Sequence, residues 1–216
     1  MKIIGHRGAH GLAPENTVAS LLKAVEHGAD EIEFDLRVTK DSQVVLHHDP
    51  ELLDAAGNKL LIAARSLAEL RQHKSDLATF AEAMQAINRQ RPVCIEIKPE
   101  VDLKPIVEQL KNYLDWPISV GSFSQPILRE LHRTFPELAL MVIEKWSGVR
   151  ASYRARQLGT KRLSMNQRWL WWGFIRSMSR AGYQLAAYTV NNPAQARRWA
   201  RHGLYGVITD YPDRFK

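Results

Sequence analysis

The chain has 216 residues, 45% of them hydrophobic, with a formal net charge of +7 at pH 7 and one cysteine, Cys94. This length suffices to bury the core of one α/β domain, and a single cysteine excludes an internal disulfide. No stretch reaches the roughly 20 uninterrupted apolar residues of a membrane-spanning helix. The first residues lack the charged and apolar regions of a signal peptide, so we expect the protein to be cytoplasmic.

Positive charge is concentrated in the last third of the chain. From residue 145 to residue 216 the sequence has 14 Lys or Arg and only two acidic residues, whereas the remainder has 16 basic and 21 acidic residues. A cationic third suits an anionic substrate, an acidic membrane surface or nucleic acid, and it does not choose among them.

The chain opens with a short apolar run, residues 2–5, which predicts a buried strand that ends at His6-Arg7-Gly8. The glycine lets the backbone approach a ligand closely, while His6 offers a titratable imidazole and Arg7 a fixed cation for phosphate. Residues 14–17 are expected to open an amphipathic helix that ends at His27-Gly28. The order is therefore strand, helix, strand.

Residues 32–36, Ile-Glu-Phe-Asp-Leu, predict a strand with two carboxylates on one face. Side chains alternate along a strand, so Glu33 and Asp35 point the same way. Two carboxylates this close resist joint ionisation unless a cation lies between them. The pair therefore predicts either a shared proton or a metal ion.

The polar residues 40–43 predict a hairpin after this strand. With Asp41-Ser42 as a two-residue loop, Asp35 lies opposite His48, with Cβ atoms roughly 5 Å apart. Residues 50–78 form a short insertion with an apolar run at 60–62 and a short helix near 67–71.

Beyond the insertion, strands and helices alternate to the end of the chain. A helix from Thr79 leads to a strand at residues 92–99 that carries Glu96 and Lys98 on one face. Eight parallel strands close a TIM-type (βα)8 barrel, whose chemistry gathers at the C-terminal ends of the strands. We therefore predict a single domain over residues 1–216. The remaining strands are expected at 118–123, 138–143, 162–165, 184–190 and 206–210, separated by helices near 106–114, 125–134, 150–157, 170–181 and 192–202.

Charged and titratable side chains at these strand ends meet the needs of phosphodiester hydrolysis. The reaction requires an activated oxygen nucleophile, neutralised phosphate oxygens and a proton for the leaving alkoxide. All-oxygen ligation favours Mg²⁺ or Ca²⁺ over zinc. We assign one divalent cation to Glu33, Asp35 and Glu96, phosphate binding to Arg7 and Lys98, and acid–base catalysis to His6 and His48.

Eight short motifs, in order and over nearly the whole chain, resemble the glycerophosphodiester phosphodiesterase family. The resemblance implies a TIM-type barrel, a divalent cation, and hydrolysis of glycerophosphodiesters such as glycerophosphocholine or glycerophosphoethanolamine to sn-glycerol 3-phosphate and an alcohol. By position it supports the same metal ligands and histidines and, besides Arg7 and Lys98, suggests substrate contacts for Glu15, Asn16, Phe123 and Tyr188. The motifs are His6-Arg7-Gly8, Pro14-Glu15-Asn16-Thr17, Glu33-Phe34-Asp35, His48-Asp49-Pro50, Glu96-Ile97-Lys98, Ser122-Phe123, Thr189-Val190-Asn191 and Thr209-Asp210-Tyr211-Pro212.

Two positions depart from the family pattern. The family usually has Trp before Thr-Val-Asn, where this chain has Tyr188. It also usually has a longer insertion with an Arg-Thr pair after His-Asp-Pro, where this chain continues with residues 51–54, Glu-Leu-Leu-Asp. The second departure leaves the leaving alcohol open.

Several interpretations stay open. Trp169, Trp171, Trp172 and Phe174 predict a helix face packed on the barrel; the sharper alternative is a wet aromatic rim, flanked by Arg168 and Arg176, that touches acidic lipid. The same segment favours a lysophospholipase D acting on lysophospholipids as an alternative function. A catalytically silent barrel that binds phosphorylated ligands or nucleic acid is the alternative from another class, although we expect no nucleic acid partner. Oligomeric state is left open.

Three further residues are kept out of the predicted site. His47 is expected to point to the face opposite His48, so we interpret it as structural. His10 is interpreted as a loop residue. Ser122 is not expected to be a nucleophile, because no third residue completes a triad with it and a histidine.

Overall fold

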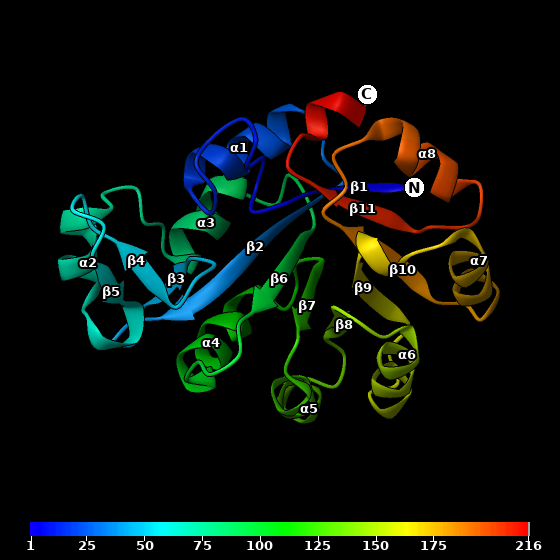
Figure 1. The fold of residues 1–216 in the computed structure, drawn as a ribbon. Helices are drawn as coiled ribbons and strands as arrows, with labels where there is room; N and C mark the ends of the chain where they lie inside the picture. Colours follow the sequence, from blue (N-terminus) through cyan, green and yellow to red (C-terminus); the bar gives the residue numbers. More distant parts are fainter. Residues whose placement is uncertain (216) are drawn as a thin grey trace.

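Eight parallel strands close into a barrel in the computed structural model, which describes residues 1–215 (Figure 1). The barrel closes because β1 pairs on one side with β11, through Ile4 and Ile208, and on the other with β2, through Gly5 and Ile32. The predicted TIM-type fold is therefore confirmed. The strands are β1 Lys2–Gly5, β2 Glu31–Val38, β6 Val93–Ile97, β7 Ile118–Ser122, β8 Ala139–Glu144, β9 Arg162–Asn166, β10 Gln184–Tyr188 and β11 Gly206–Thr209.

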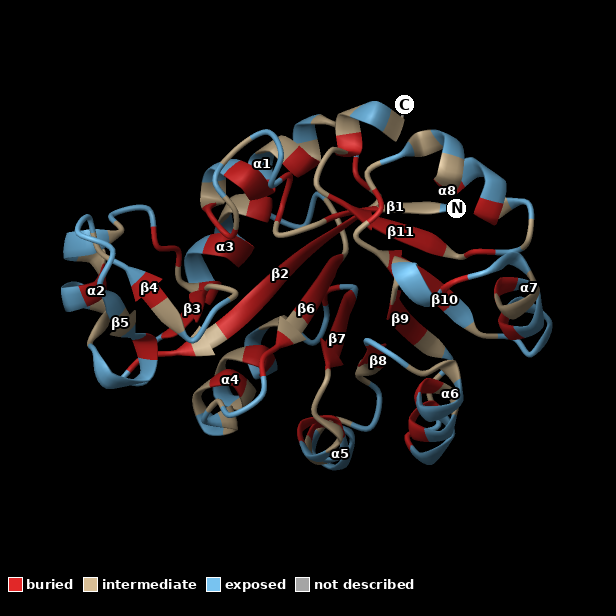
Figure 2. Ribbon diagram, viewed as in Figure 1, coloured by how far each residue is buried: buried red, intermediate tan, exposed pale blue. Residues whose placement is uncertain are grey.

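Helices surround the sheet and turn their apolar sides toward it. Figure 2 shows buried residues along the inner side of each outer helix and exposed residues along the outer side, as an amphipathic stripe requires. None of the helices within residues 1–215 is both long and apolar enough to cross a membrane. The outer helices are α1 Val18–Glu26, α3 Phe80–Ile87, α4 Leu103–Leu110, α5 Gln125–Thr134, α6 Gly148–Gln157, α7 Trp172–Arg180 and α8 Pro193–Ala200, followed by the 3₁₀ turn η4 Pro212–Phe215.

The first outer helix begins later than its sequence suggests. Thr17 caps α1 by accepting from the backbone N–H of Ser20, and the Ser20 hydroxyl satisfies the N–H of Thr17 in return, a reciprocal capping box. Residues 14–16 therefore lie in the preceding loop and not in the helix. Asn16 adopts a left-handed backbone conformation there, with φ +56°, which Asn tolerates better than most residues.

The hairpin after β2 has a register one residue away from the predicted one. Strand β3, Val44–Leu46, pairs with β2 so that Leu36 faces Leu46, and the Thr39 N–H bonds to the Gln43 carbonyl. The loop therefore has three residues, the last of which, Ser42, has φ +61°, as three-residue hairpin loops commonly do. The predicted pairing of Asp35 with His48 is wrong, because the Asp35 carbonyl accepts from the N–H of His47 at 3.1 Å.

The insertion follows β3 and projects from one side of the barrel (cyan and teal in Figure 1). Its residues Ile62, Leu70 and Leu77 form a small apolar cluster with Val45 of β3. The boundaries of a single domain over residues 1–216 stay a prediction. The elements of the insertion are β4 Glu51–Leu53, β5 Lys59–Leu61, the 3₁₀ turn η1 Ile62–Ala64 and α2 Leu67–His73.

The tryptophan-rich segment is not the packed helix face that we expected. Trp169 and Trp171 precede α7 and Trp172 is its first residue; all three side chains are exposed. The buried residues of α7 are instead Ile175 and Met178. The expectation fails because the helix starts two residues later than predicted, which leaves the indoles in the connecting loop and first turn. Of the four aromatic residues only Phe174 packs against the core.

Candidate active site

A cavity of about 280 Å³ opens where the strands of the barrel end. Its volume is near the lower limit of small-molecule pockets, about 300 Å³. Eight of the eleven predicted site residues line it: His6, Arg7, Glu33, His48, Glu96, Lys98, Phe123 and Tyr188. Glu15, Asn16 and Asp35 are not among the lining residues and lie directly behind them.

The three predicted metal ligands converge because of strand register. Asp35 on β2 is the direct partner of Glu96 on β6, and Glu33 lies two residues earlier on the same face of β2. One oxygen from each carboxylate lies within 4.8 Å of the others. Three all-oxygen donors at this spacing can hold a hard divalent cation.

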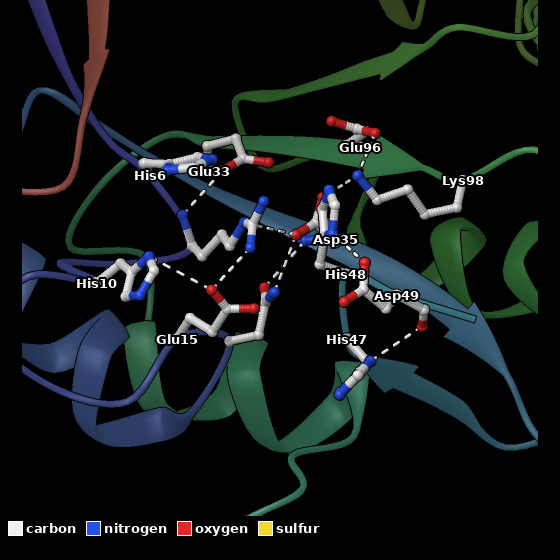
Figure 3. A network of polar contacts seen from close by, with 12 residues as sticks. His6, His10, Glu15, Glu33, Asp35, His47, His48, Asp49, Glu96 and Lys98 are labelled. Carbon is white, nitrogen blue, oxygen red and sulfur yellow. Dashed lines mark hydrogen bonds and ion pairs between the residues drawn. The ribbon is translucent and has the colours of Figure 1, made fainter. Parts of the chain in front are cut away.

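Lys98 lies between two of these carboxylates (Figure 3). Its Nζ is 2.7 Å from Oδ1 of Asp35 and also contacts Oε1 of Glu96. Burial alone would raise the pKa of Asp35, but Lys98 and Arg7 outweigh it and hold that pKa below its ordinary value. The same two carboxylates overcome the effect of burial on Lys98 and raise its pKa, so the ammonium stays charged.

The other two carboxylates are more readily protonated than an ordinary glutamate. Burial, followed by repulsion from Asp35 and Glu96, raises the pKa of Glu33 well above its ordinary value. Burial and repulsion from Asp35 likewise raise the pKa of Glu96 to about 7. An added cation would favour the ionised form of both groups.

Arg7 connects the loop after β1 to the carboxylates. Its backbone N–H donates to Glu33 at 2.8 Å, its Nη1 donates to Glu15 at 2.7 Å, and its Nε lies 3.4 Å from Asp35. The next residue, Gly8, has φ +83°, and a Cβ there would lie 2.4 Å from the backbone of Ser20. Glycine is therefore required for the turn that aims Arg7 into the cavity.

The Glu15-Asn16 pair supports the site from behind. Asn16 is buried, donates from Nδ2 to Asp35 at 2.9 Å and accepts from the Asp35 N–H at 3.1 Å. Glu15 pairs with Arg7 and lies 3.3 Å from Nδ1 of His10. These contacts position Asp35 and Arg7; the substrate contacts predicted for Glu15 and Asn16 stay predictions.

Each predicted catalytic histidine has a carboxylate at the same ring nitrogen. Nδ1 of His6 lies 2.6 Å from Asp210, and Nδ1 of His48 lies 2.7 Å from Asp49. With Nδ1 occupied, Nε2 of each ring remains for the substrate. Burial and then the charge of Lys98 lower the pKa of His48. The two rings line one cavity despite the wrong hairpin register, because the chain leaves β3 at Leu46.

Asp210 and Asn191 are the functional candidates that our sequence interpretation missed. Burial would raise the pKa of Asp210, but hydrogen bonds from His6 and Asn191 lower it. Asn191 donates to Asp210 at 2.7 Å and accepts from its N–H at 2.9 Å. Both residues occur in the quoted motifs, and the position of Asp210 directly after the last strand was the signal that could have assigned it.

The residues that we excluded behave in different ways. His47 turns away from the carboxylates and bonds through Nδ1 to the Asp49 carbonyl at 3.0 Å (Figure 3). The Ser122 hydroxyl is buried and donates to the Ile97 carbonyl at 2.7 Å. His10, in contrast, lies at the edge of the site, 3.7 Å from Asp210.

The opposite wall of the cavity is aromatic and neutral. Phe123 and Tyr188 meet edge to face, with ring centroids 6.4 Å apart, and the Tyr188 hydroxyl donates to the Glu144 carbonyl at 3.1 Å. Burial raises the pKa of Tyr188 and keeps its hydroxyl protonated. This wall offers apolar contact and no competing charge.

Comparison with known proteins gives a consistent answer. Residues 6–214 match the model of the glycerophosphoryl diester phosphodiesterase family. A glycerophosphodiester phosphodiesterase of Caldanaerobacter subterraneus is 25% identical over 98% of this chain and 94% of its own length, and human lysophospholipase D GDPD1 is 26% identical over 100% and 85%. An Oleispira antarctica phosphodiesterase, solved in complex with the product sn-glycerol 3-phosphate, superposes with a TM-score of 0.91 at 28% identity and covers 100% of this chain and 95% of that one. These matches confirm the predicted enzyme class and leave no support for a catalytically silent barrel: the chain belongs to the glycerophosphoryl diester phosphodiesterase family.

Proposed function

We propose that the enzyme hydrolyses small glycerophosphodiesters, such as glycerophosphocholine and glycerophosphoethanolamine, to sn-glycerol 3-phosphate and an alcohol. One observation carries the proposal: three carboxylates, two fixed cations and two oriented histidines meet at a single cavity. Its volume of about 280 Å³ suits a phosphodiester with two small alcohols. The Oleispira relative was solved with this same product.

We further propose that Glu33, Asp35 and Glu96 hold one Mg²⁺ or Ca²⁺ ion. These three carboxylates contact two cations, Arg7 and Lys98, so an excess of negative charge remains when all three are ionised. Burial, followed by repulsion from the neighbouring carboxylates, raises the pKa values of Glu33 and Glu96. A divalent cation restores the balance, and oxygen donors favour these two ions. When bound, it would withdraw charge from the phosphate and acidify a coordinated hydroxyl.

The remaining steps belong to the protein. Arg7 and Lys98 neutralise the two non-bridging phosphate oxygens and orient the diester. One imidazole, through Nε2, removes the proton of the attacking hydroxyl, and the other returns a proton to the alkoxide as its bond to phosphorus breaks. Each transfer typically contributes about 10²–10⁴-fold to the rate. The attacking oxygen belongs either to water, which gives sn-glycerol 3-phosphate directly, or to the 2-hydroxyl of the glycerol. The second route expels the alcohol and forms a cyclic phosphate, and water then opens the ring to give sn-glycerol 3-phosphate.

A product analysis tests the proposal. Purified enzyme is incubated with glycerophosphocholine, glycerophosphoethanolamine or a long-chain lysophosphatidylcholine, each with Mg²⁺, Ca²⁺ or chelator, and ³¹P NMR identifies the phosphate products. We expect sn-glycerol 3-phosphate from the first two substrates and its loss with chelator. Release of phosphocholine, or full turnover in chelator, would overturn the proposal.

Lysophospholipase D activity is the second candidate, favoured by the human relative of that name and by the exposed tryptophans beside the cavity. The same substrate panel separates the two functions. Lysophospholipase D activity would be established if lysophosphatidic acid formed from the lysolipid faster than sn-glycerol 3-phosphate formed from glycerophosphocholine. Cytoplasmic location stays a prediction.

A further inference from the structure

We propose that an aromatic rim at the mouth of the barrel docks the enzyme on an anionic lipid surface. The rim consists of Trp146, Trp169, Trp171 and Trp172, whose residues are 57%, 50%, 61% and 58% exposed. Large aromatic side chains normally bury most of their area, so four exposed indoles together require an explanation. This surface goes beyond the hydrolytic site and is independent of it.

The rim lies on the same end of the barrel as the cavity. Trp146 follows β8, and Trp169 and Trp171 follow β9, so both connecting segments leave the C-terminal ends of their strands. The rings of Trp146 and Trp169 lie 5.8 Å apart and join the two segments. Between them and the cavity, the Gln167 side chain donates to the carbonyl of Thr189, a lining residue.

The rim is also held in place from below. Glu144, buried at the end of β8, accepts from the backbone N–H groups of Lys145 and Trp146 and is clamped by Arg150 at 2.6 Å. A Cβ at Gly148 would lie 2.3 Å from the ring of Phe174, so α6 and α7 meet closely beneath the indoles. The indoles therefore project from segments that hydrogen bonds and the packing of α6 against α7 hold in place.

Charge around the rim fits an anionic partner. Lys145, Arg168 and Arg176 are exposed, and within residues 1–215 none of them pairs with a carboxylate. The sequence contains no Asp or Glu at all between residues 145 and 209. Basic side chains near an anionic leaflet each contribute to binding, and indoles favour the membrane–water interface. A dimer through this rim would bring the cations of both copies together, which disfavours a second copy as occupant.

The geometry places the cavity beside the proposed membrane surface. The segments that carry the rim connect β8 to α6 and β9 to α7, and these helices lie on the side of the barrel away from the insertion (Figure 1). Docking through the rim would thus leave the insertion side open to water, so small alcohols could leave the cavity there.

Vesicle binding without turnover tests the proposal. The protein is sedimented with vesicles of phosphatidylcholine alone or of equal parts phosphatidylcholine and phosphatidylglycerol, and tryptophan emission is recorded with brominated phosphatidylcholine as quencher. We expect binding and quenching only with the anionic vesicles, weakened by salt. Absence of binding, or equal binding to neutral vesicles, would overturn the proposal.

Matched variants locate the contact. Arg168→Gln should weaken partition about fivefold, because each basic residue near the leaflet contributes about that factor, and Trp169→Ala combined with Trp171→Ala should weaken it about tenfold through lost apolar burial. Arg156→Gln, in the last turn of α6, and Leu114→Ala change exposed residues at the other end of the barrel and should bind as wild type. Equal losses in both sets would overturn the assignment.

Further measurements distinguish two other partners of the rim, a second copy of the chain and nucleic acid. If sedimentation velocity showed a dimer that Trp169→Ala dissociates, a second copy of the chain would be the partner of the rim. If the protein bound duplex DNA more strongly than vesicles and in a salt-sensitive way, nucleic acid would be the partner. Unchanged hydrolysis of glycerophosphocholine in the rim variants would show that any loss of binding is not a loss of folding.

Discussion

The two sides of the cavity are built from different parts of the chain and differ in charge. The side formed by β1, β2, β6, the residues after β3 and Asp210 after β11 carries every charged or titratable group proposed for the reaction. The side formed by β7 to β10 contributes Phe123, Tyr188 and neutral residues such as Asn166. Bond cleavage and recognition of substrate shape are thus expected on opposite sides, and variants of the two sides should affect different kinetic constants.

The largest effect is expected for Glu33→Gln. Loss of one proposed metal ligand should reduce kcat/KM by about 10³-fold or more, because a metal ion at such a site stabilises the charge that develops on the phosphate in the transition state. Steady-state kinetics with excess Mg²⁺ or Ca²⁺ measures it.

Glu31→Gln is the matched control. Glu31 lies on the same strand and face as Glu33, is equally buried, but pairs with Arg162 at the other end of the barrel at 3.2 Å. It should lower stability while leaving the activity of the folded enzyme intact. Comparable loss of activity in both variants would show that the effect of Glu33→Gln does not come from the proposed metal site.

The next largest effect is expected for Asp210→Asn. Without the carboxylate at Nδ1, His6 loses its orientation and tautomer, so kcat should fall about 10²-fold with KM little changed. Asp49→Asn should cost less, about tenfold, because the Asp49 side chain is 70% exposed against 20% for Asp210. The pH–rate profiles of both variants measure the effect; a larger loss for Asp49→Asn would reverse our ranking of the two pairs.

A pH effect on stability is expected from the crowded carboxylates. The pKa of Glu96 is raised from 4.5 to about 7 in the folded protein by burial and by Asp35. Between these values the folded protein retains a proton that the unfolded chain has released, so stability falls as pH rises from about 5 to 7, by roughly 1–3 kcal/mol, and then levels. Burial also raises the pKa of Glu33, so this carboxyl contributes to the same loss of stability as the pH rises.

Urea unfolding at pH 5, 6 and 7 in chelator measures this slope. Glu96→Gln should flatten it relative to wild type, and the difference between the two proteins removes the contribution of the histidines. Mg²⁺ or Ca²⁺ should flatten it too, because a bound cation favours the ionised carboxylates. A slope that Glu96→Gln leaves unchanged would show that other groups cause it.

Within the acidic side of the cavity, the carboxylate cluster was predictable from the sequence and the neighbouring hairpin was not. Strand alternation places Glu33 and Asp35 on one face, and the pairing of β2 with β6 then brings in Glu96. The hairpin register was mispredicted because Ser42, at φ +61°, adds one residue to the loop. No local sequence pattern predicts that backbone conformation for a serine.

Long-range contacts explain the other omissions. The pairing of His6 with Asp210 joins residues 204 positions apart, so only closure of the barrel brings them together. The exposure of the tryptophans was missed for a different reason. Hydrophobicity alone predicts that a run of tryptophans is buried, but the exposure of Trp171 depends on where α7 begins.

The smallest effect is expected on the neutral side, for Tyr188→Phe. This change removes the hydrogen bond to the Glu144 carbonyl while keeping the edge-to-face contact with Phe123. A neutral hydrogen bond contributes about 1 kcal/mol, so KM for glycerophosphocholine should rise about two- to fivefold with kcat within about twofold. Tyr188→Ala, which also removes the ring, should raise KM further while kcat falls less than in Asp210→Asn. If Tyr188→Phe instead lowered kcat as strongly as Asp210→Asn, the hydroxyl would belong to the reacting side, and the cavity would not divide as its charges suggest.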